Sequence, residues 1–144
     1  MIEFVIGGDD PEDEETIEYH KGKPSKVPVH LFGECILTDK IKEMMAKGPA
    51  YKAFVEKSLQ QFYNLDWGDI TEVKEDVEAN YDAIKRGCGS TIFGIYNTHF
   101  HHDKEKEYLI MVIYIICNNF CTDSTDMQIT GVRPTHTVLF PSEY

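Results

Sequence analysis

The chain has 144 residues, of which 42% are hydrophobic and 12% aromatic, and its 25 acidic against 14 basic residues give a formal net charge of −11. This length is typical of one domain with one core, and no stretch approaches the ~18 uncharged apolar residues of a membrane span. The acidic balance argues against attraction to nucleic-acid phosphates or anionic lipid. We therefore expect no direct nucleic-acid binding, no membrane association and a basic partner.

The N-terminus and the cysteines bear on the compartment. The sequence lacks a basic region followed by an apolar run and a small-residue cleavage site, so we expect a cytoplasmic protein. The four cysteines are scattered and show neither a disulfide framework nor zinc-binding spacing: they are Cys35, Cys88, Cys117 and Cys121. We interpret Cys35 and Cys117 as small apolar strand residues.

The first quarter of the chain is predicted to contain two strands separated by an acidic segment. Ile2–Ile6 alternates β-prone side chains, and Val29–Leu37 returns to strand character. Between them, residues 9–28 begin with the run DDPEDEETIE and offer almost nothing to bury. This composition predicts a flexible arm or loop.

Two helices are predicted next. Thr38 is an N-cap residue before a short apolar face, Gly48 closes that helix and Pro49 opens the second. The second helix has the clearest pattern, because its apolar residues recur at i, i+3, i+4 and i+7 and so face a core. They are Tyr51, Phe54, Val55, Leu59 and Phe62, and Ser58 lies on the same stripe.

A third helix is predicted to begin at Asp69 or Thr71 and to end at Arg86. Its acidic residues fall into two rows beside the apolar stripe, where like charges destabilise a helix by a few tenths of a kcal/mol per pair. The rows are Glu72 with Asp76, and Glu75 with Glu78 and Asp82. The rows indicate either a solvated acidic face or a surface that binds a basic partner by resembling a line of phosphates.

The sequence of the last third of the chain predicts mainly strands. Ser90–Asn97 and Glu107–Cys117 are β-rich runs joined by a polar loop, and the second is apolar on both alternating faces, as a central strand is. Met127–Val132 and Thr135–Phe140 can supply one or two more strands. We therefore predict a single α+β domain over residues 1–144, with a mainly antiparallel sheet of about five strands and about three helices packed on one face.

Several short motifs in the chain resemble a family of small plasmid- and phage-encoded proteins. The motifs are the run Asp66-Trp67-Gly68-Asp69, Asp76 and Asn80 spaced as D-x-x-x-N, Gly87 after the helix, the strand reaching Tyr96, and the closing Thr137–Tyr144 as T-V-L-x-P-x-E-Y. Members of this family are labelled plasmid-related or restriction-modification-associated proteins.

The resemblance covers roughly residues 29–144 and implies a mobile-element setting in a bacterial host cell and a small α+β fold. It carries over no catalytic residue. The chain departs from the family pattern in its acidic N-terminal segment, in the histidine-bearing hairpin loop, and between Cys117 and Thr130. An activity peculiar to this chain could reside in any of these segments.

The Asp66–Asp69 run has two readings. As a joint between helices, its carboxylates accept backbone N–H bonds and Trp67 is buried against the core. As a ligand pocket, Trp67 forms an aromatic wall, with Asp66 or Asp69 beside it to bind a cationic or base-containing ligand. The first reading is structural and the second is functional.

The stretch YNTHFHHD contains an H-x-H-x-D spacing of the kind that holds zinc in metallo-β-lactamase-like hydrolases. His99, His101 and Asp103 are the candidate ligands. Lys104 follows the aspartate where that pattern needs another histidine, and a catalytic zinc usually takes three protein ligands with their own orienting partners. We interpret the stretch as a solvated hairpin loop and regard metal binding as the alternative.

No other catalytic constellation emerges. Cys88 has glycine neighbours but no identifiable His and Asp/Asn pair to activate it, and no phosphate-cradling glycine motif occurs. We predict no cofactor and do not expect an enzyme. The leading hypothesis is a mobile-element protein that presents an acidic surface to a basic host protein, a class that includes defence nucleases. The alternative is a small-molecule or nucleotide binding module at Trp67. The oligomeric state does not follow from the sequence.

Overall fold

The computed structural model describes residues 17–72, 74–87, 89–102, 107–122 and 131–144. Its elements in chain order are β1 (Glu18–His20), β2 (Lys23–Lys26), the 3₁₀ turn η1 (Val29–Phe32), β3 (Glu34–Leu37), α2 (Asp39–Ala46), α3 (Pro49–Tyr63), η2 (Asp69–Glu72), α4 (Lys74–Arg86), β4 (Ser90–His102), β5 (Glu107–Phe120), β6 (Thr135–Leu139) and η4 (Pro141–Glu143). The predicted strand Ile2–Ile6, the acidic run at 9–16, Asp103 and most of Met127–Val132 lie outside the described residues.

The strands form a two-stranded sheet, β1–β2, and a four-stranded sheet in the order β3-β6-β5-β4. In the larger sheet β4 pairs with β5 and β5 with β6 in antiparallel fashion, whereas β3 and β6 are parallel. The predicted α+β fold with a mainly antiparallel sheet and three helices is confirmed. β5 lies between two strands over Tyr114–Asn118, as its apolar sequence predicts.

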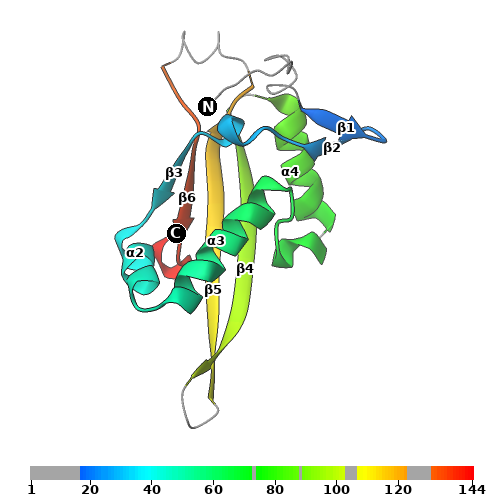
Figure 1. Ribbon diagram of the computed structural model, residues 1–144. Helices are drawn as coiled ribbons and strands as arrows, with labels where there is room; N and C mark the ends of the chain where they lie inside the picture. Colours follow the sequence, from blue (N-terminus) through cyan, green and yellow to red (C-terminus); the bar gives the residue numbers. More distant parts are fainter. Residues whose placement is uncertain (1–16, 73, 88, 103–106, 123–130) are drawn as a thin grey trace, which may run out of the picture.

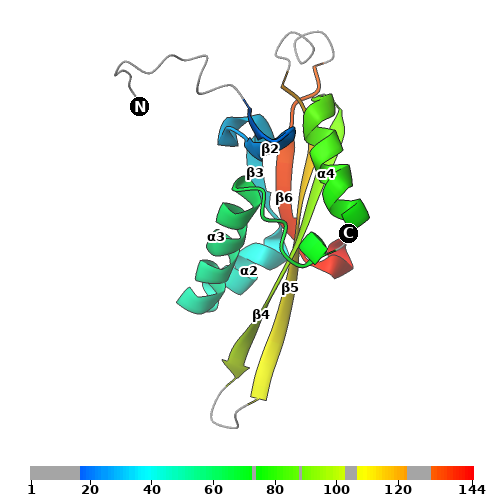
Figure 2. The ribbon, with the colours of Figure 1, turned by 90° about the vertical axis from the view of Figure 1, so that its right-hand side faces the viewer.

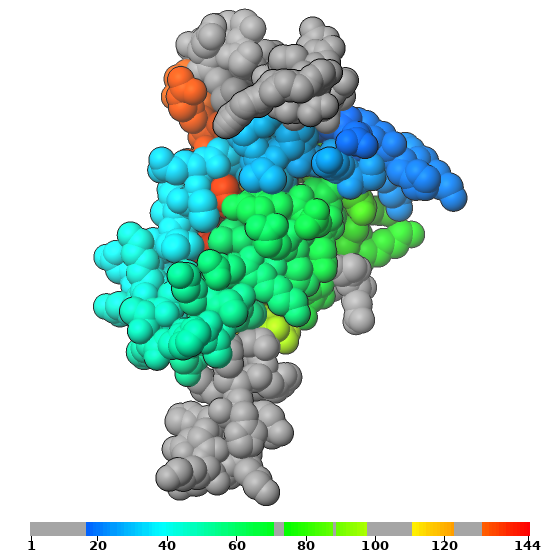
Figure 3. Space-filling view, in the orientation of Figure 1, coloured from blue at the N-terminus to red at the C-terminus, as the bar shows by residue number. Residues whose placement is uncertain are grey.

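One face of the larger sheet carries the core. Ile92, Tyr96, Ile113 and Ile115 alternate along β4 and β5, and all four are buried. Helix α3 crosses this face, and α4 runs beside β4, which is an outer strand of the sheet (Figures 1 and 2). The space-filling view shows α3 and the β1–β2 hairpin over the front of the molecule (Figure 3).

The helix boundaries follow from local chemistry. Thr38 caps α2 by accepting the Ile41 N–H at 3.3 Å, and Pro49 is the first residue of α3, both as predicted. On the predicted stripe of α3, Val55 and Phe62 are buried at 0% exposure, whereas Tyr51, Phe54 and Leu59 are partly buried against the same core.

The predicted strand Val29–Leu37 is only half correct, because Val29–Phe32 forms the 3₁₀ turn η1 and β3 begins at Glu34. Gly33 separates them at φ +78°, and a Cβ there would lie 1.9 Å from the Pro134 carbonyl oxygen. Only glycine allows the chain to bend this close to the residue that precedes β6.

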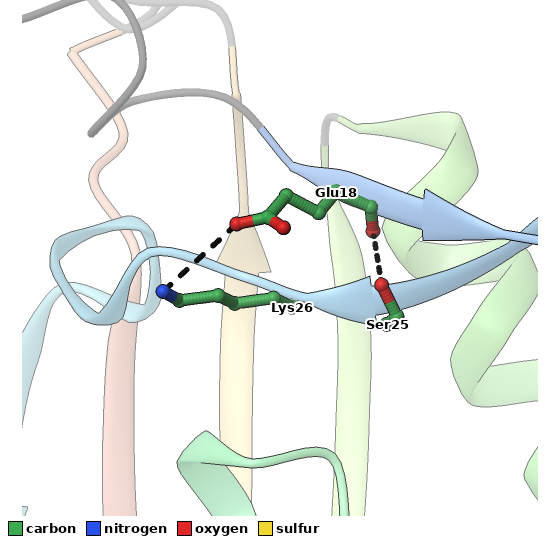
Figure 4. A network of polar contacts seen from close by, with 3 residues as sticks. All are labelled: Glu18, Ser25 and Lys26. Carbon is green, nitrogen blue, oxygen red and sulfur yellow. Dashed lines mark hydrogen bonds and ion pairs between the residues drawn. The ribbon is translucent and has the colours of Figure 1, made fainter.

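The part of the predicted arm that the structure describes is a hairpin. Lys21 and Gly22 both have positive φ, +52° and +81°, as a two-residue turn between antiparallel strands requires. Ser25 donates to the Glu18 carbonyl at 3.2 Å, and Lys26 lies 3.9 Å from the Glu18 carboxylate (Figure 4). The arm interpretation missed this turn because Lys-Gly is a weaker hairpin signal than Asn-Gly.

The β4–β5 hairpin is longer than predicted. The backbone register continues through His99 paired with Ile110 and His101 with Tyr108, so these histidines lie within β4 and not in a loop, contrary to the prediction. Both strands extend beyond the helices as a two-stranded ribbon (Figures 1 and 2).

The C-terminus is fastened to the sheet. The Glu143 carboxylate accepts the Thr38 hydroxyl at 3.0 Å and the Phe140 N–H at 2.9 Å. The Tyr144 ring lies against Phe93 and Tyr114 on the face of the sheet opposite the core, with centroids 6.4 and 5.9 Å away. The closing motif therefore pins the last strand.

Candidate functional site

The predicted acidic residues divide between two elements. Glu75, Asp76, Glu78 and Asp82 all lie in α4 and are exposed. Glu72 lies in η2, so the predicted Glu72–Asp76 row does not run along one helix. The other row, Glu75, Glu78 and Asp82, is contained in α4. We refer to these three residues as the α4 acidic row.

The α4 acidic row is not neutralised from within. Among the described residues no ion pair involves Glu75, Glu78 or Asp82. A shallow pocket of about 180 Å³ lies against the row, lined by Lys23, Glu78, Tyr81, Asp82 and Lys85. The two lysines border the pocket beyond ion-pair distance, so both carboxylates remain available to a partner.

The inner side of α4 explains the position of the row. Asn80 is 4% exposed and uses its amide twice, because it donates to the Phe93 carbonyl at 2.8 Å and accepts the Phe93 N–H at 3.1 Å. The side chain thus satisfies backbone groups on the outer edge of β4, which pairs with no strand in the described part of the chain. Ala83 and Ile84 are buried beside it. Holding Asn80 inward turns the acidic row toward solvent.

The Asp66–Asp69 run forms backbone contacts with the same outer edge of β4, at Ile95. The Ile95 N–H donates to the Trp67 carbonyl at 3.1 Å, and Gly68 forms an isolated parallel bridge with Ile95. Gly68 has φ +68°, and a Cβ there would lie 1.9 Å from the Ile95 carbonyl oxygen. A residue with a side chain therefore cannot approach β4 this closely.

The two aspartates have local partners. Asp66 accepts the Gly68 N–H at 3.1 Å and the Gln61 side-chain amide at 2.9 Å. Asp69 accepts the side-chain amide of Asn97 from β4. Both carboxylates thus fasten the run to its surroundings, although both residues remain exposed.

Tyr96 ties the core face of β4 to the run. Its hydroxyl donates to the Asp66 carbonyl at 2.7 Å. Burial raises the pKa of the Tyr96 phenol far above its usual range, and the Asp66 charge adds to that shift. The phenol therefore stays neutral and acts as a donor.

Trp67 is 1% exposed and contacts the Tyr81 ring edge-on, with centroids 5.1 Å apart. Its indole N–H is buried and finds no hydrogen-bond acceptor among the residues that the structure describes. A pocket of about 280 Å³ lies on the Tyr81 side, lined by His20, Lys23, Pro24, Ser25, Asn64, Leu65 and Tyr81. Trp67 does not line this pocket, so a ligand there would contact Tyr81 directly and the indole only from behind it.

A buried series of hydrogen bonds lies between β6, α3 and η1, and it was not predicted from the sequence. His136 is 2% exposed, and its Nδ1 lies 3.2 Å from the Phe32 carbonyl oxygen while its Nε2 lies 2.7 Å from the Tyr63 hydroxyl. A carbonyl only accepts, so Nδ1 carries the proton and Nε2 accepts from Tyr63. Nothing local in the sequence brings these residues together.

The pKa shifts of His136, Tyr63 and the neighbouring Cys35 oppose reactivity. Burial lowers the pKa of His136, and burial together with Cys35 raises the pKa of Tyr63 to about 12. Burial also raises the pKa of the Cys35 thiol, with the Tyr63 hydroxyl partly offsetting it. A protonated thiol is a poor nucleophile, and an imidazole of lowered pKa whose Nε2 already accepts from Tyr63 is a weak base, so these contacts satisfy polar groups and do not form an activated nucleophile.

The remaining candidates have less support. His99 and His101 lie in β4, Asp103 lies outside the described residues, and within the described ranges no group of three or more His, Cys, Asp or Glu could hold a metal ion. A further pocket of about 320 Å³ lies between η1 and the start of β6, lined by His30, Leu31, Gly33, Glu34, Cys121, Arg133, Pro134 and Thr135. It contains none of the predicted site residues.

Comparison with known proteins returns no match to any family model, curated protein or solved structure. No helix in the described part of the chain has both the length and the apolar run needed to cross a bilayer. Four residues of the short sequence motifs share a role in this structure. Asp66, Gly68, Asn80 and Tyr96 all bond β4 or the segment along it.

Proposed function

We propose that the protein acts by binding a basic partner protein through the exposed carboxylates of α4. The observation that carries the proposal is the pair Glu78 and Asp82. Both are exposed in the middle of α4 and line a common pocket together with Lys23, Tyr81 and Lys85, without an ion pair in the described chain. A lysine or arginine entering that pocket would meet two carboxylates on adjacent turns.

The helix dipole accounts for part of the charge pattern but not for this pair. Glu75 and Asp76 lie in the first turn and Lys85 and Arg86 in the last, which stabilises a helix by itself. The dipole effect fades within one turn of each end. Glu78 and Asp82 therefore need another explanation, and a basic partner provides it.

The kind of partner follows from the chemistry and from the resemblance. Carboxylates one helical turn apart, about 5–6 Å, resemble a line of phosphates to a protein that grips nucleic acid. A plasmid or phage origin, in the cytoplasm of a bacterial host, makes a host nucleic-acid-binding protein the partner class, and a defence nuclease is one such protein. The protein would then be an inhibitor that occupies the partner's basic site.

The test compares two triple variants that change the net charge equally. Glu75→Gln, Glu78→Gln and Asp82→Asn neutralise the α4 acidic row, whereas Glu34→Gln, Glu43→Gln and Glu56→Gln neutralise exposed residues elsewhere. A partner captured from a bacterial host should lose at least tenfold in affinity with the first variant only, and wild-type affinity should fall steeply with added salt. Equal losses would mean that only net charge matters, and undiminished binding by the first variant would refute the proposal.

One observation favours a second function, a small-molecule or nucleotide binding module. The Trp67 indole N–H lacks an acceptor among the described residues, and Tyr81, whose ring contacts Trp67, lines a pocket together with Lys23. A buried unpaired donor costs ~1–3 kcal/mol unless water or a ligand meets it. Absorbance and mass spectrometry of the purified protein test this function, because a retained nucleotide would favour it over the acidic surface.

A further inference from the structure

The pocket between η1 and the start of β6 has no part in the function proposed above. Its volume, about 320 Å³, exceeds the 180 and 280 Å³ of the two pockets that Tyr81 lines. It shares no lining residue with the α4 acidic row or with the Asp66–Asp69 run. Small-molecule sites begin at ~300 Å³, so this pocket has room for a small metabolite and not for a dinucleotide.

Burial divides the lining into an apolar floor and a polar rim. Leu31 and Cys121 are 7% and 4% exposed, and Pro134 is buried as well. The exposed lining residues are His30, Glu34 and Arg133. A ligand that fills the pocket therefore meets apolar atoms inside and charged groups at the mouth.

Two opposite charges at the rim come from neighbouring positions of adjacent chain segments. Glu34 of β3 is the register partner of Thr135 of β6, and Arg133 precedes Thr135 by two residues (Figure 1). Arg133 is also one of only two arginines in the chain. Within the described ranges neither charged side chain forms an ion pair or a hydrogen bond. The carboxylate and the guanidinium are therefore both free to bind a ligand.

Backbone contacts hold the walls of the pocket in place. Gly33 approaches Pro134 so closely that a Cβ would lie 1.9 Å from its carbonyl oxygen, and the Gly33 N–H donates to the His30 carbonyl at 3.1 Å. Next to Cys121, the Thr122 N–H donates to the Gly87 carbonyl at 2.6 Å. Walls that are already ordered lower the entropic cost of binding a ligand.

We infer that this pocket binds a free α-amino acid with an apolar side chain. The Arg133 guanidinium donates to the α-carboxylate, and the Glu34 carboxylate accepts from the α-ammonium group. The side chain of the ligand lies on the floor that Leu31 and Pro134 form. This arrangement pairs both rim charges and removes apolar surface from water at the same time.

The charge of the chain favours a zwitterion over a simple ion. An anion with an apolar body would pair with Arg133, but it would also meet the Glu34 carboxylate and the field of a chain with a formal charge of −11. An amine would meet the Arg133 guanidinium. An amino acid carries no net charge and offers each rim group an opposite charge.

The first experiment compares L-leucine and L-phenylalanine with three analogues of leucine that each lack one feature. Isocaproate lacks the ammonium group, isoamylamine lacks the carboxylate, and glycine lacks the apolar side chain. NMR titration of the full chain should show both amino acids shifting the amides of Leu31, Gly33 and Thr135, which line the pocket. Each analogue should bind at least roughly tenfold more weakly than L-leucine.

The second experiment uses charge variants with matched controls. Arg133→Gln and Glu34→Gln should each weaken L-leucine binding at least roughly tenfold. Arg86→Gln and Glu43→Gln remove the same charges from exposed residues outside the pocket, so they should leave its affinity unchanged. All four side chains are exposed, and the NMR spectrum of each variant reports its fold directly.

The outcome is independent of the basic partner, because the pocket and the α4 acidic row share no residue. The control triple variant that contains Glu34→Gln should therefore lose L-leucine and still bind the partner. The triple variant of the α4 acidic row should show the reverse.

Three results would overturn the inference. The first is the absence of shifts at Leu31, Gly33 and Thr135 with either amino acid up to about 10 mM, including shifts confined to other residues. The second is isocaproate or isoamylamine binding as tightly as L-leucine, which would mean that the pocket uses one rim charge only. The third is an equal loss for Glu34→Gln and Glu43→Gln, or for Arg133→Gln and Arg86→Gln, which would assign the effect to overall charge.

Discussion

The strands β4 and β5 run side by side along their whole length, yet their two ends have opposite surroundings. Near the helices, the outer edge of β4 is closed by Asn80, by the Trp67 carbonyl and by Gly68. Beyond Asn97 the same pair has only itself within the described chain. The closed part uses Trp67, Gly68 and Asn80 from the short sequence motifs, so these residues have a role in the scaffold. The proposed function uses groups that this scaffold leaves exposed, the carboxylates of α4.

The largest expected loss of stability comes from a substitution at Gly68, in the closed part of β4. Gly68→Ala should lower the free energy of unfolding by about 2–5 kcal/mol, from the positive φ and from the clash with the Ile95 carbonyl. Gly89 has almost the same φ, +69°, but nothing within 4 Å of a new Cβ, so Gly89→Ala should cost only about 1–2 kcal/mol. Urea denaturation measures both, and equal costs would show that the approach to β4 is unimportant.

Asn80→Ala should produce the next largest effect, a loss of about 2–3 kcal/mol. The substitution leaves both the N–H and the carbonyl of Phe93 unpaired at a site with little access to water. Asn64→Ala is the control, because Asn64 is exposed and its amide makes one bond, to the Gln60 carbonyl. Hydrogen exchange at Phe93 should accelerate with the first variant and not with the second.

Local chemistry predicted the helices well and the edges poorly. The Thr38 cap, Pro49 and the stripe of α3 are signals contained within a few residues, and the structure confirms them. The closure of β4 by Trp67, Gly68 and Asn80 joins segments far apart in sequence, and no periodicity reports such a contact. The Lys21-Gly22 turn and the full length of β4 were missed because polar residues such as His99 and His101 occur in strands as well as in loops.

The candidate site was predictable only in part. Exposed acids on a helix face follow from spacing, so the residues of the α4 acidic row could be named from sequence. The burial of Trp67 and a carboxylate that accepts a backbone N–H were expected from the helix-joint reading, and the structure has both. The bond of Asp66 to Gln61 could not be predicted, because it depends on how the chain turns at Asn64 and Leu65. Leu65 itself has φ +62°, which no sequence rule anticipates for leucine.

A smaller effect concerns His136, which lies on the core side of the same sheet. Its pKa is lowered in the folded state, so below the ordinary value of about 6.5 the unfolded chain takes up a proton that the folded chain does not. The wild type should therefore lose stability as pH falls from about 6.5 toward the lower folded pKa. His136→Gln should lack this part of the pH dependence, whereas a substitution of the exposed His30 should retain it. Denaturation at pH 7.5, 6.5 and 5.5 checks the difference.

The smallest expected effect on stability is that of the α4 acidic row. A small effect would distinguish the row from Gly68 and Asn80, which hold the run and α4 against β4. Glu75, Glu78 and Asp82 are exposed and make no ion pair in the described chain, so neutralising all three should change the free energy of unfolding by no more than about 0.5 kcal/mol. The sign should be slightly stabilising for Glu78 and Asp82, because like charges one turn apart repel, and slightly destabilising for Glu75, which lies in the first turn. Denaturation of the three single variants separates these contributions.

A loss of several kcal/mol for Glu78→Gln or Asp82→Asn would mean that the row helps to hold α4 on β4. A loss of partner binding by the triple variant would then be a folding defect. Preserved stability together with lost binding would assign the carboxylates to the partner.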